Sequence, residues 1–422
     1  MQASIFQEPL AMTDRRDFTF AFVLAFSCLP LISVLLPRFM TFCPSLLGLG
    51  FYLYLIAVRK ESVPLNRAYL LISLGIGFLC VFSAAFSSHP GAVLKKAGLT
   101  TLLIASGVFL LAVCRHLDPR SLRRHAWIFA ALLILATAVA IFELSLNMPI
   151  YRIIHEANPT RRLNTSVMNR GAVNIVLCSF FALSCLWQWD GKKEWRIGLG
   201  IALFVTIALM LGLSQVQAAQ LALGAGLVFY FLYPAGWKPG YAIFAVLLCA
   251  LLLATPWMAH WLFTGFAADL QSVAWLKSGY AGARLEIWDF SSRYALQSPL
   301  TGHGMDGTRY VESFDHARLY HKEDSVLHPH NFAVQLWVDF GLIGAASGCA
   351  LLVYILFQIR RCGPSLARAS LTTFFLTLLV AALSYGMWQS HWIGVLIYLV
   401  AVQQFFSSFQ PDSSEAHNIR QA

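Results

Sequence analysis

The chain has 422 residues, of which 58% are apolar and only 12% are charged, with a formal net charge of +10. This composition excludes an ordinary soluble domain, in which about 25% of residues are charged. The chain is predicted to be an integral membrane protein whose surroundings are lipids, with no nucleic-acid partner.

Apolar segments long enough to cross ~30 Å of hydrocarbon as helices recur from end to end. The first follows Arg15 and Arg16 and is too long for a signal peptide, so it is predicted to be a transmembrane helix. We therefore predict an all-α polytopic membrane protein, a single integral membrane domain over residues 1–422, with about 12 transmembrane helices. The predicted segments are 18–36, 41–58, 68–86, 97–114, 126–145, 171–188, 197–213, 217–233, 240–262, 331–358, 367–385 and 391–408.

Basic residues set the predicted orientation. With twelve helices both termini share one side, and 17 of the 30 Lys and Arg residues then fall on that side in short connectors. The positive-inside rule makes this side cytoplasmic. The polar tail 410–422 is predicted to be a disordered cytoplasmic segment. The nine cysteines lie mostly in apolar segments without C-x-x-C spacing, so we interpret them as small core hydrophobes.

Two outward loops, 146–170 and 264–330, contain most of the remaining positive charge. The longer loop also carries eight acids, so many of its charges can simply be solvated. The shorter, basic loop carries Arg161, Arg162 and Arg170 against only Glu156, which favours a binding role. Nine of the twelve histidines also fall on the outward side, and imidazole is the usual base for removing a proton from a hydroxyl.

An amphipathic helix is predicted over 281–297 within the long loop. Arg284 and Trp288 are four residues apart and therefore neighbours on one face, whereas Arg293 falls on the opposite side. An aromatic ring beside an arginine at a membrane surface suits a polyanion joined to a lipid or a sugar. The alternative is interfacial anchoring by Trp288 with Arg284 extended toward the water.

The long loop ends in His328-Pro329-His330-Asn331. Pro329 keeps the preceding residue out of helical geometry, and Asn331 is a suitable N-cap for the following apolar helix. The positive end of that helix would favour neutral imidazole, which keeps His330 available as a base. The alternative is a histidine ordered by the cap for structural reasons. A metal cluster with His321, Glu323 and Asp324 is disfavoured, because the spacing matches no regular ligand pattern.

These residues resemble the O-antigen ligase family. His330-Asn331, nine residues and then Gly341-Leu342-Ile343-Gly344 fit its H-[NSQ]-x9-G-x-x-[GTY] pattern, and Arg284-x-x-x-Trp288 fits its [KR]-x3-[FWY] pattern. Pro299-Leu300-Thr301-Gly302-His303-Gly304 is similar to the P-x-x-G-x-G stretch of the wider ligase and polymerase superfamily. The motifs occur in family order, in the predicted outward loop.

The resemblance implies a GT-C-like, metal-independent glycosyltransferase without a cofactor. It would transfer a glycan from undecaprenyl pyrophosphate to the lipid A–core oligosaccharide of lipopolysaccharide, at the periplasmic face of a Gram-negative inner membrane. In this interpretation His330 is the base, with inversion at the anomeric carbon. Arg284, with Arg161 and Arg170, neutralises the pyrophosphate leaving group. The implied substrate-binding residues are Arg161, Arg170, Arg162, Trp288, Gln215, His328, His303 and Asn331.

Three alternatives remain open from the sequence. Within the superfamily these are an O-antigen polymerase and a protein O-oligosaccharyltransferase, which differ in acceptor. From another class, a transporter or flippase of lipid-linked glycans would bind the same donor. One departure concerns Ser214-Gln215, where many superfamily members carry Ser-Arg. Gln215 can hydrogen-bond a phosphate or a sugar but cannot neutralise it.

Overall fold

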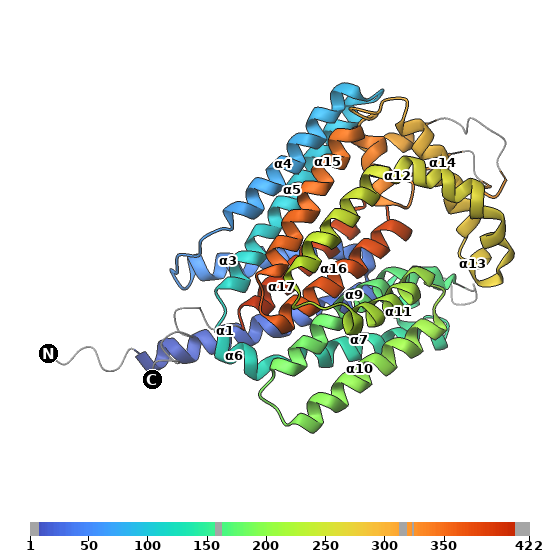
Figure 1. Ribbon diagram of the computed structural model, residues 1–422. Coiled ribbons are helices and arrows are strands. Elements are labelled where there is room, and N and C mark those ends of the chain that lie inside the picture. The colour runs from blue at the N-terminus through green and yellow to red at the C-terminus, as the bar shows by residue number, and fades with distance from the viewer. Residues whose placement is uncertain (1–7, 157–162, 312–318, 323–324, 410–422) are drawn as a thin grey trace.

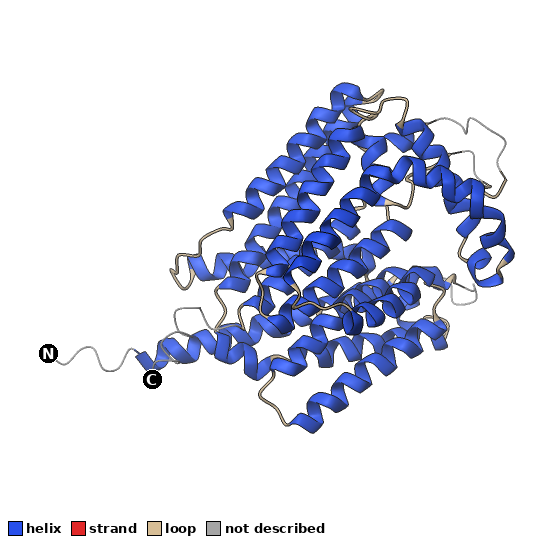
Figure 2. Ribbon diagram, viewed as in Figure 1, coloured by secondary structure: helices blue, strands red, loops and turns tan. Residues whose placement is uncertain are grey.

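The protein is helical throughout the part that its computed structural model describes, residues 8–156, 163–311, 319–322 and 325–409, and no strand occurs in those ranges (Figure 2). Figure 1 shows a bundle of long helices with a group of shorter helices arching over one corner. The predicted all-α polytopic fold is therefore confirmed. The predicted cytoplasmic tail, 410–422, lies outside the described residues.

The helices follow one another along the chain with short connections. Their bounds are α1 (Glu8–Ser27), α2 (Leu29–Leu35), η1 (Pro37–Thr41), α3 (Cys43–Ala57), α4 (Arg67–Phe82), η2 (Ser83–Phe86), α5 (Pro90–Arg115), α6 (Pro119–His125), α7 (Trp127–Ser145), α8 (Pro149–Ile154), η3 (Thr165–Met168), α9 (Asn169–Gln188), α10 (Lys193–Leu213), α11 (Gln217–Leu232), α12 (Lys238–Ser272), α13 (Ala274–Ser278), α14 (Ala281–Ala295), η4 (Gly307–Tyr310), α15 (Phe332–Arg360), α16 (Pro364–Leu383) and α17 (Ser390–Ser407).

Each of the twelve predicted apolar segments coincides with a helix or a pair of helices. Within the described ranges, ten helical segments are long and apolar enough to cross a membrane, and α3 and α11 are two shorter apolar helices. Helix starts follow local sequence signals: the side chain of Asn66 caps α4, that of Asp118 caps α6, and Pro90 stands first in α5.

Both described chain ends lie at the same end of the bundle. Arg15 in α1 donates a hydrogen bond to the carbonyl of His116 (3.1 Å), and Arg123 in α6 donates one to the carbonyl of Phe409 (2.8 Å). The opposite end, here called the distal end, carries η1, η2, η4 and the 384–389 turn between α16 and α17. The backbone N–H of Met305, for example, donates to Ser83 Oγ there (3.0 Å).

Helix α12 is longer than a membrane crossing requires. Its 35 residues extend over about 52 Å at 1.5 Å per residue, against ~30 Å of hydrocarbon. Its last turns therefore continue past the predicted ninth span into segment 264–330, where α13 and α14 follow. Gln217, at the start of α11, donates a hydrogen bond to Ser278 Oγ at the end of α13 (2.9 Å). α14 then packs back on α12 and α15, completing the arch in Figure 1.

Helix α15 is broken at Gly341, which adopts φ +58° and ψ −144°. Residues 299–304 lie against this break and replace the helical hydrogen bonds: Leu342 N–H donates to Pro299 O (2.8 Å) and Gly304 N–H to Asp339 O (3.0 Å). A Cβ on Gly341 would lie 2.6 Å from the carbonyl carbon of Leu300, so only glycine fits here. The first glycine of the G-x-x-G pattern thus joins the 299–304 stretch to the helix that begins at His330-Asn331.

Candidate active site at the distal end

His330 lies between Pro329 and the N-cap of α15, and its backbone has a φ of +54°. Asn331 caps the helix as predicted, because its Oδ1 accepts from the N–H groups of Ala333 (2.9 Å) and Val334 (3.2 Å). His330 Nδ1 lies 2.7 Å from the carbonyl oxygen of Ser384. A carbonyl can only accept, so Nδ1 carries the hydrogen and a neutral His330 presents the lone pair of Nε2.

The surroundings of His330 favour this neutral form. Burial lowers the pKa of its imidazole, and the positive charge of Arg284 lowers it further, while the hydrogen bond to Ser384 acts in the opposite direction. The neutral ring was expected from the sequence, but the expected cause was the helix dipole. In the structure the largest cause is desolvation, which depends on how the 384–389 turn and α14 cover the ring.

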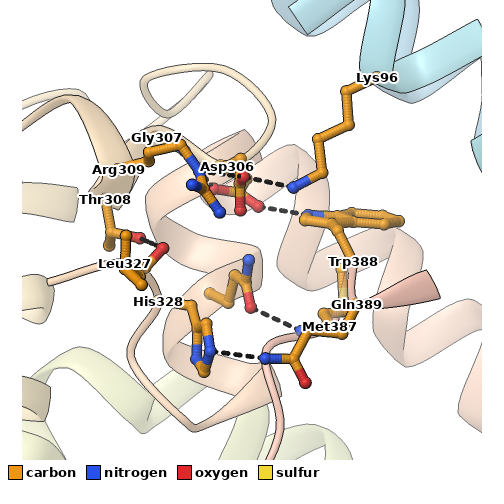
Figure 3. Close-up of polar contacts among 12 residues, drawn as sticks. Lys96, Asp306, Gly307, Thr308, Arg309, Leu327, His328, Met387, Trp388 and Gln389 are labelled. Atoms are coloured by element: carbon orange, nitrogen blue, oxygen red, sulfur yellow. Dashed lines mark hydrogen bonds and ion pairs between the residues drawn. The ribbon is translucent and has the colours of Figure 1, made fainter. Parts of the chain in front are cut away.

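His328 lies beside His330, with ring centroids 4.1 Å apart. Its Nε2 accepts a hydrogen bond from the side-chain amide of Gln389 (2.7 Å), as the lower part of Figure 3 shows. Burial, followed by the neighbouring His330, lowers the pKa of His328 to about 4, so the ring is neutral near pH 7. The hydrogen is then on Nδ1, which is buried and has no partner among the described residues.

Helix α14 brings Arg284 and Trp288 to this histidine pair. The indole N–H of Trp288 donates to the carbonyl of Pro329 (2.9 Å), the residue between the two histidines. Within the described ranges, Arg284 makes no side-chain hydrogen bond or ion pair, although burial lowers the pKa of its guanidinium. Arg293, on the opposite side of α14 as predicted, instead pairs with Asp289 (3.2 Å). Arg284 is therefore the cation of this helix that is available to a ligand.

A buried carboxylate fixes residues 319–321 of the loop to α14. Glu286 is 0% exposed, and its two oxygens accept from the backbone N–H groups of Leu319 (2.6 Å), Tyr320 (2.8 Å) and His321 (2.7 Å). Three N–H donors replace the water that the charge loses on burial. The contact places His321 near enough to His330 for its charge to lower the pKa of that imidazole. Glu286 thus holds residues 319–321 beside the site.

The turn 384–389 is held against α15 by two buried side chains. Asp339 is 0% exposed, and its Oδ1 accepts from Gly307 N–H (2.9 Å) while its Oδ2 accepts from the indole N–H of Trp388 (2.6 Å). Gln335, one turn earlier, accepts from Met387 N–H (2.7 Å). These bonds position the Ser384 carbonyl and Gln389, the two groups that orient His330 and His328.

Figure 3 shows a second polar group beside the turn. The carboxylate of Asp306 forms ion pairs with the ammonium group of Lys96 and with Nε of Arg309 (2.9 Å). These charges reach His328, because Asp306 raises its pKa while Arg309 and Lys96 lower it. Two cations against one carboxylate leave the patch positive.

The remaining predicted residues lie in different surroundings. His303 contacts α14: its Nε2 donates a hydrogen bond to the carbonyl of Tyr294 (2.8 Å), and its ring stacks on the Tyr294 ring with centroids 3.8 Å apart. Gln215 is exposed and makes no side-chain hydrogen bond within the described ranges. Arg161 and Arg162 lie outside the described residues, and Arg170 lies at the start of α9, beside Tyr385.

Sequence reasoning missed residues 384–391 as a part of the site. This segment, here called the 384–391 turn, consists of the 384–389 turn and the first two residues of α17. Its signal was a cluster of polar and aromatic residues, Ser-Tyr-Gly-Met-Trp-Gln-Ser-His, between two apolar segments. Asp339 was visible only as a charge inside a predicted span. As for metals, no group of three or more His, Cys, Asp or Glu side chains that could hold an ion occurs in the described ranges, which leave out Glu323 and Asp324.

Comparisons with known proteins found one family model and several relatives that are similar to this chain. The model of the family described as "O-Antigen ligase" matches residues 202–349, from α10 to the first half of α15, which includes Arg284, Trp288 and His330. A "Putative polysaccharide ligase" of Rickettsia conorii is 24% identical over 358 residues, 82% of this chain and 81% of that protein. Proteins of the same description match over 129 residues, 29% of this chain and 32% of each relative, at 28% identity in Rickettsia prowazekii and 30% in Rickettsia bellii.

Proposed function

We propose that this chain, a member of the O-antigen ligase family, transfers a glycan from undecaprenyl pyrophosphate to the lipid A–core oligosaccharide of lipopolysaccharide. The site would face the periplasm of a Gram-negative inner membrane, with both termini in the cytoplasm. The family match and the names of the relatives support a polysaccharide ligase in general. The donor, the acceptor and the residue roles are our proposal.

One observation carries the proposal: a histidine whose Nε2 lone pair is not used lies beside an arginine that has no hydrogen-bond or ion-pair partner, both among the described residues. The Ser384 carbonyl fixes the His330 tautomer at 2.7 Å, and the charge of Arg284 acts on that imidazole. A base and a cation are the two groups that glycosyl transfer from a diphosphate needs. A transporter would need the cation but has no use for an oriented base.

In the proposed reaction, His330 Nε2 accepts the proton of an acceptor hydroxyl as its oxygen attacks the anomeric carbon. The bond between that carbon and the diphosphate oxygen breaks, and undecaprenyl pyrophosphate leaves with the bonding electrons. Attack from the face opposite the leaving group inverts the anomeric configuration. Arg284 neutralises the charge that develops on the diphosphate, and this favours the transition state over the ground state.

The half-buried setting of Arg284 strengthens this effect. A guanidinium presents a planar fork that grips two phosphate oxygens, and partial removal from water increases the interaction energy. Trp288 holds the 329–330 backbone one helical turn away, so the cation and the base belong to one rigid unit. We assign Trp288, His328 and Asn331 to positioning or contacting the substrates around this unit.

The test is transfer by purified protein supplied with undecaprenyl-pyrophosphate glycan and lipid A–core oligosaccharide. We expect transfer by the wild type and by Lys277→Gln, an exposed cation in α13, and transfer at least about 100-fold slower by His330→Ala or Arg284→Ala. Supplying a second lipid-linked glycan or a protein as acceptor instead separates ligase from polymerase and oligosaccharyltransferase. Near wild-type transfer by a folded His330→Ala or Arg284→Ala protein would contradict the assignment.

A further inference from the structure

A small pocket lies at the distal end, between α2, α9 and α17, outside the pair formed by His330 and Arg284. Its lining includes Ser33, Arg170, Tyr385, His391 and Trp392. The rings of Tyr385 and His391 are 5.2 Å apart, and Tyr385 directly follows Ser384, whose carbonyl orients His330. The pocket therefore shares the 384–391 turn with the candidate active site.

The pocket presents polar groups that have no hydrogen-bond partner among the described residues. His391 is 8% exposed, and its Nε2 is buried without a partner in the described part of the chain. The guanidinium of Arg170 and the hydroxyl of Tyr385 also make no hydrogen bond there. Ser33, by contrast, is satisfied, since its hydroxyl donates to Pro30 O (2.6 Å) and accepts from Asn174 (3.0 Å).

The positive charge in the pocket is also uncompensated by any described residue of its lining. The charged groups that act on His391 are Arg170, Arg38 and His328, and each of these carries a positive charge or none. Among the described residues that line the pocket there is no carboxylate. Partly buried donors around an unpaired guanidinium are the arrangement that binds an oxyanion, because leaving such groups unpaired is costly.

The position of the pocket indicates which substrate it contacts. Arg284 acts electrostatically on His330, whereas Arg170 lines a separate pocket with Tyr385 and His391. That pocket is linked to His330 through Tyr385, the neighbour of Ser384, whose carbonyl lies 2.7 Å from His330 Nδ1. In an inverting displacement the acceptor approaches from the face opposite the leaving diphosphate. If Arg284 holds the diphosphate, the separate pocket of Arg170 is left for the acceptor.

We propose that the pocket of Arg170, Tyr385 and His391 binds an anionic group, a phosphate or a carboxylate, on the acceptor saccharide. This inference rests on the proposed function and gives Arg170 a partner other than the donor pyrophosphate. The anion is held one residue from the Ser384 carbonyl, so its binding places an acceptor hydroxyl next to an already oriented His330.

The first test is binding to the full-length protein in lipid nanodiscs, measured by calorimetry. The probes are farnesyl diphosphate and core oligosaccharide in three forms: native, phosphatase-treated, and with its sugar carboxylates reduced. Arg170→Gln should weaken binding of the native oligosaccharide by roughly 10–100-fold, the effect of losing a charge-assisted hydrogen bond. The affinity of the same variant for farnesyl diphosphate should stay within about threefold of the wild-type affinity. Arg284→Gln should show the reverse pattern.

The oligosaccharide forms identify the anion. Loss of wild-type affinity after phosphatase treatment assigns the pocket to a phosphate, and loss after carboxylate reduction assigns it to a carboxylate. The form that lacks the bound group should bind equally to the wild type and to Arg170→Gln. If both treated forms keep native affinity, or if Arg170→Gln weakens farnesyl diphosphate as strongly as the oligosaccharide, the proposal is overturned.

The second test separates this role from a structural one by steady-state transfer. His391→Gln and Tyr385→Phe should raise the KM for the acceptor while leaving the KM for the donor and the unfolding temperature unchanged. Lys277→Gln is the matched control and should change neither KM. A fall in kcat with both KM values unchanged would contradict an acceptor site. The binding test needs no turnover, so it stays decisive if the wild type transfers no glycan, the result that would refute the proposed function instead.

Discussion

The loop around α14 and the turn 384–391 contribute to the same site in different ways. The loop supplies side chains: Arg284, a cation without a side-chain partner in the part of the chain that the structure describes, and Trp288, which donates a hydrogen bond to the carbonyl of Pro329. The turn supplies mainly position, through the Ser384 carbonyl that orients His330 and the Gln389 amide that holds His328. The loop carries recognisable motifs and the turn carries none. The difference shows that a motif marks the reacting groups, while the residues that orient them can lie in an unmarked segment.

The largest expected effect comes from removing the group on which both segments act. His330→Ala should lower kcat by roughly 10²–10⁴-fold, the contribution of a positioned general base. Transfer is measured with purified protein at saturating donor and acceptor. The unfolding temperature and size-exclusion profile of the variant must match the wild type. A folded variant with kcat within a few-fold of the wild type would exclude His330 as the base.

Breaking the loop side alone should have a smaller but still large effect. Arg284→Gln should lower kcat by roughly 10²–10³-fold, by analogy with loss of one donor to a developing oxyanion. Arg284→Lys should recover only part of this, because an ammonium group keeps the charge but lacks the planar fork. The same assay measures both variants against Lys277→Gln. Full recovery by lysine would mean that charge alone, and not bidentate geometry, stabilises the leaving group.

Removing a hydrogen bond that holds the 384–391 turn should mainly lower the stability of the protein. Asp339→Asn leaves one acceptor oxygen for two donors, Gly307 N–H and the Trp388 indole. One donor then stays buried and unpaired, so unfolding free energy should fall by about 1–3 kcal/mol. Chemical unfolding monitored by tryptophan fluorescence measures this. Asp269→Asn, the same change at an exposed position in α12, should have no measurable effect. Equal effects of the two variants on the unfolding free energy would show that the Asp339 hydrogen bonds do not stabilise the turn.

The smallest expected effect is a shift in pH dependence that links the two segments. Burial and Arg284 lower the pKa of His330, and only the neutral ring acts as a base. Transfer should therefore rise with pH along an acid limb below the ordinary imidazole value of about 6.5, then stay level. In Arg284→Gln one lowering cause is removed, so the acid limb should move to higher pH. A profile of kcat/KM against pH tests this prediction. An acid limb at the same pH in both proteins would show that the charge of Arg284 does not act on His330.

The sequence predicted most of the helical framework correctly. Hydropathy is a local property, so each apolar segment marks its own helix, and the Asn331 cap and the helix at 281–295 were likewise visible in a few residues. The Arg284 and Trp288 face of α14 also followed from helical spacing alone. These predictions hold because the signal and the structure lie within the same ten to thirty residues of the chain.

Only the tertiary structure decided how the site is assembled. Ser384 meets His330 across 54 residues of chain, and Trp388 meets Asp339 across 49. No local pattern records such contacts, because each partner is compatible by itself with an ordinary turn or an ordinary span. The low pKa of His328 likewise depends on burial by segments distant in sequence. Composition and periodicity therefore determined which residues could do chemistry, and long-range packing determined which of them meet.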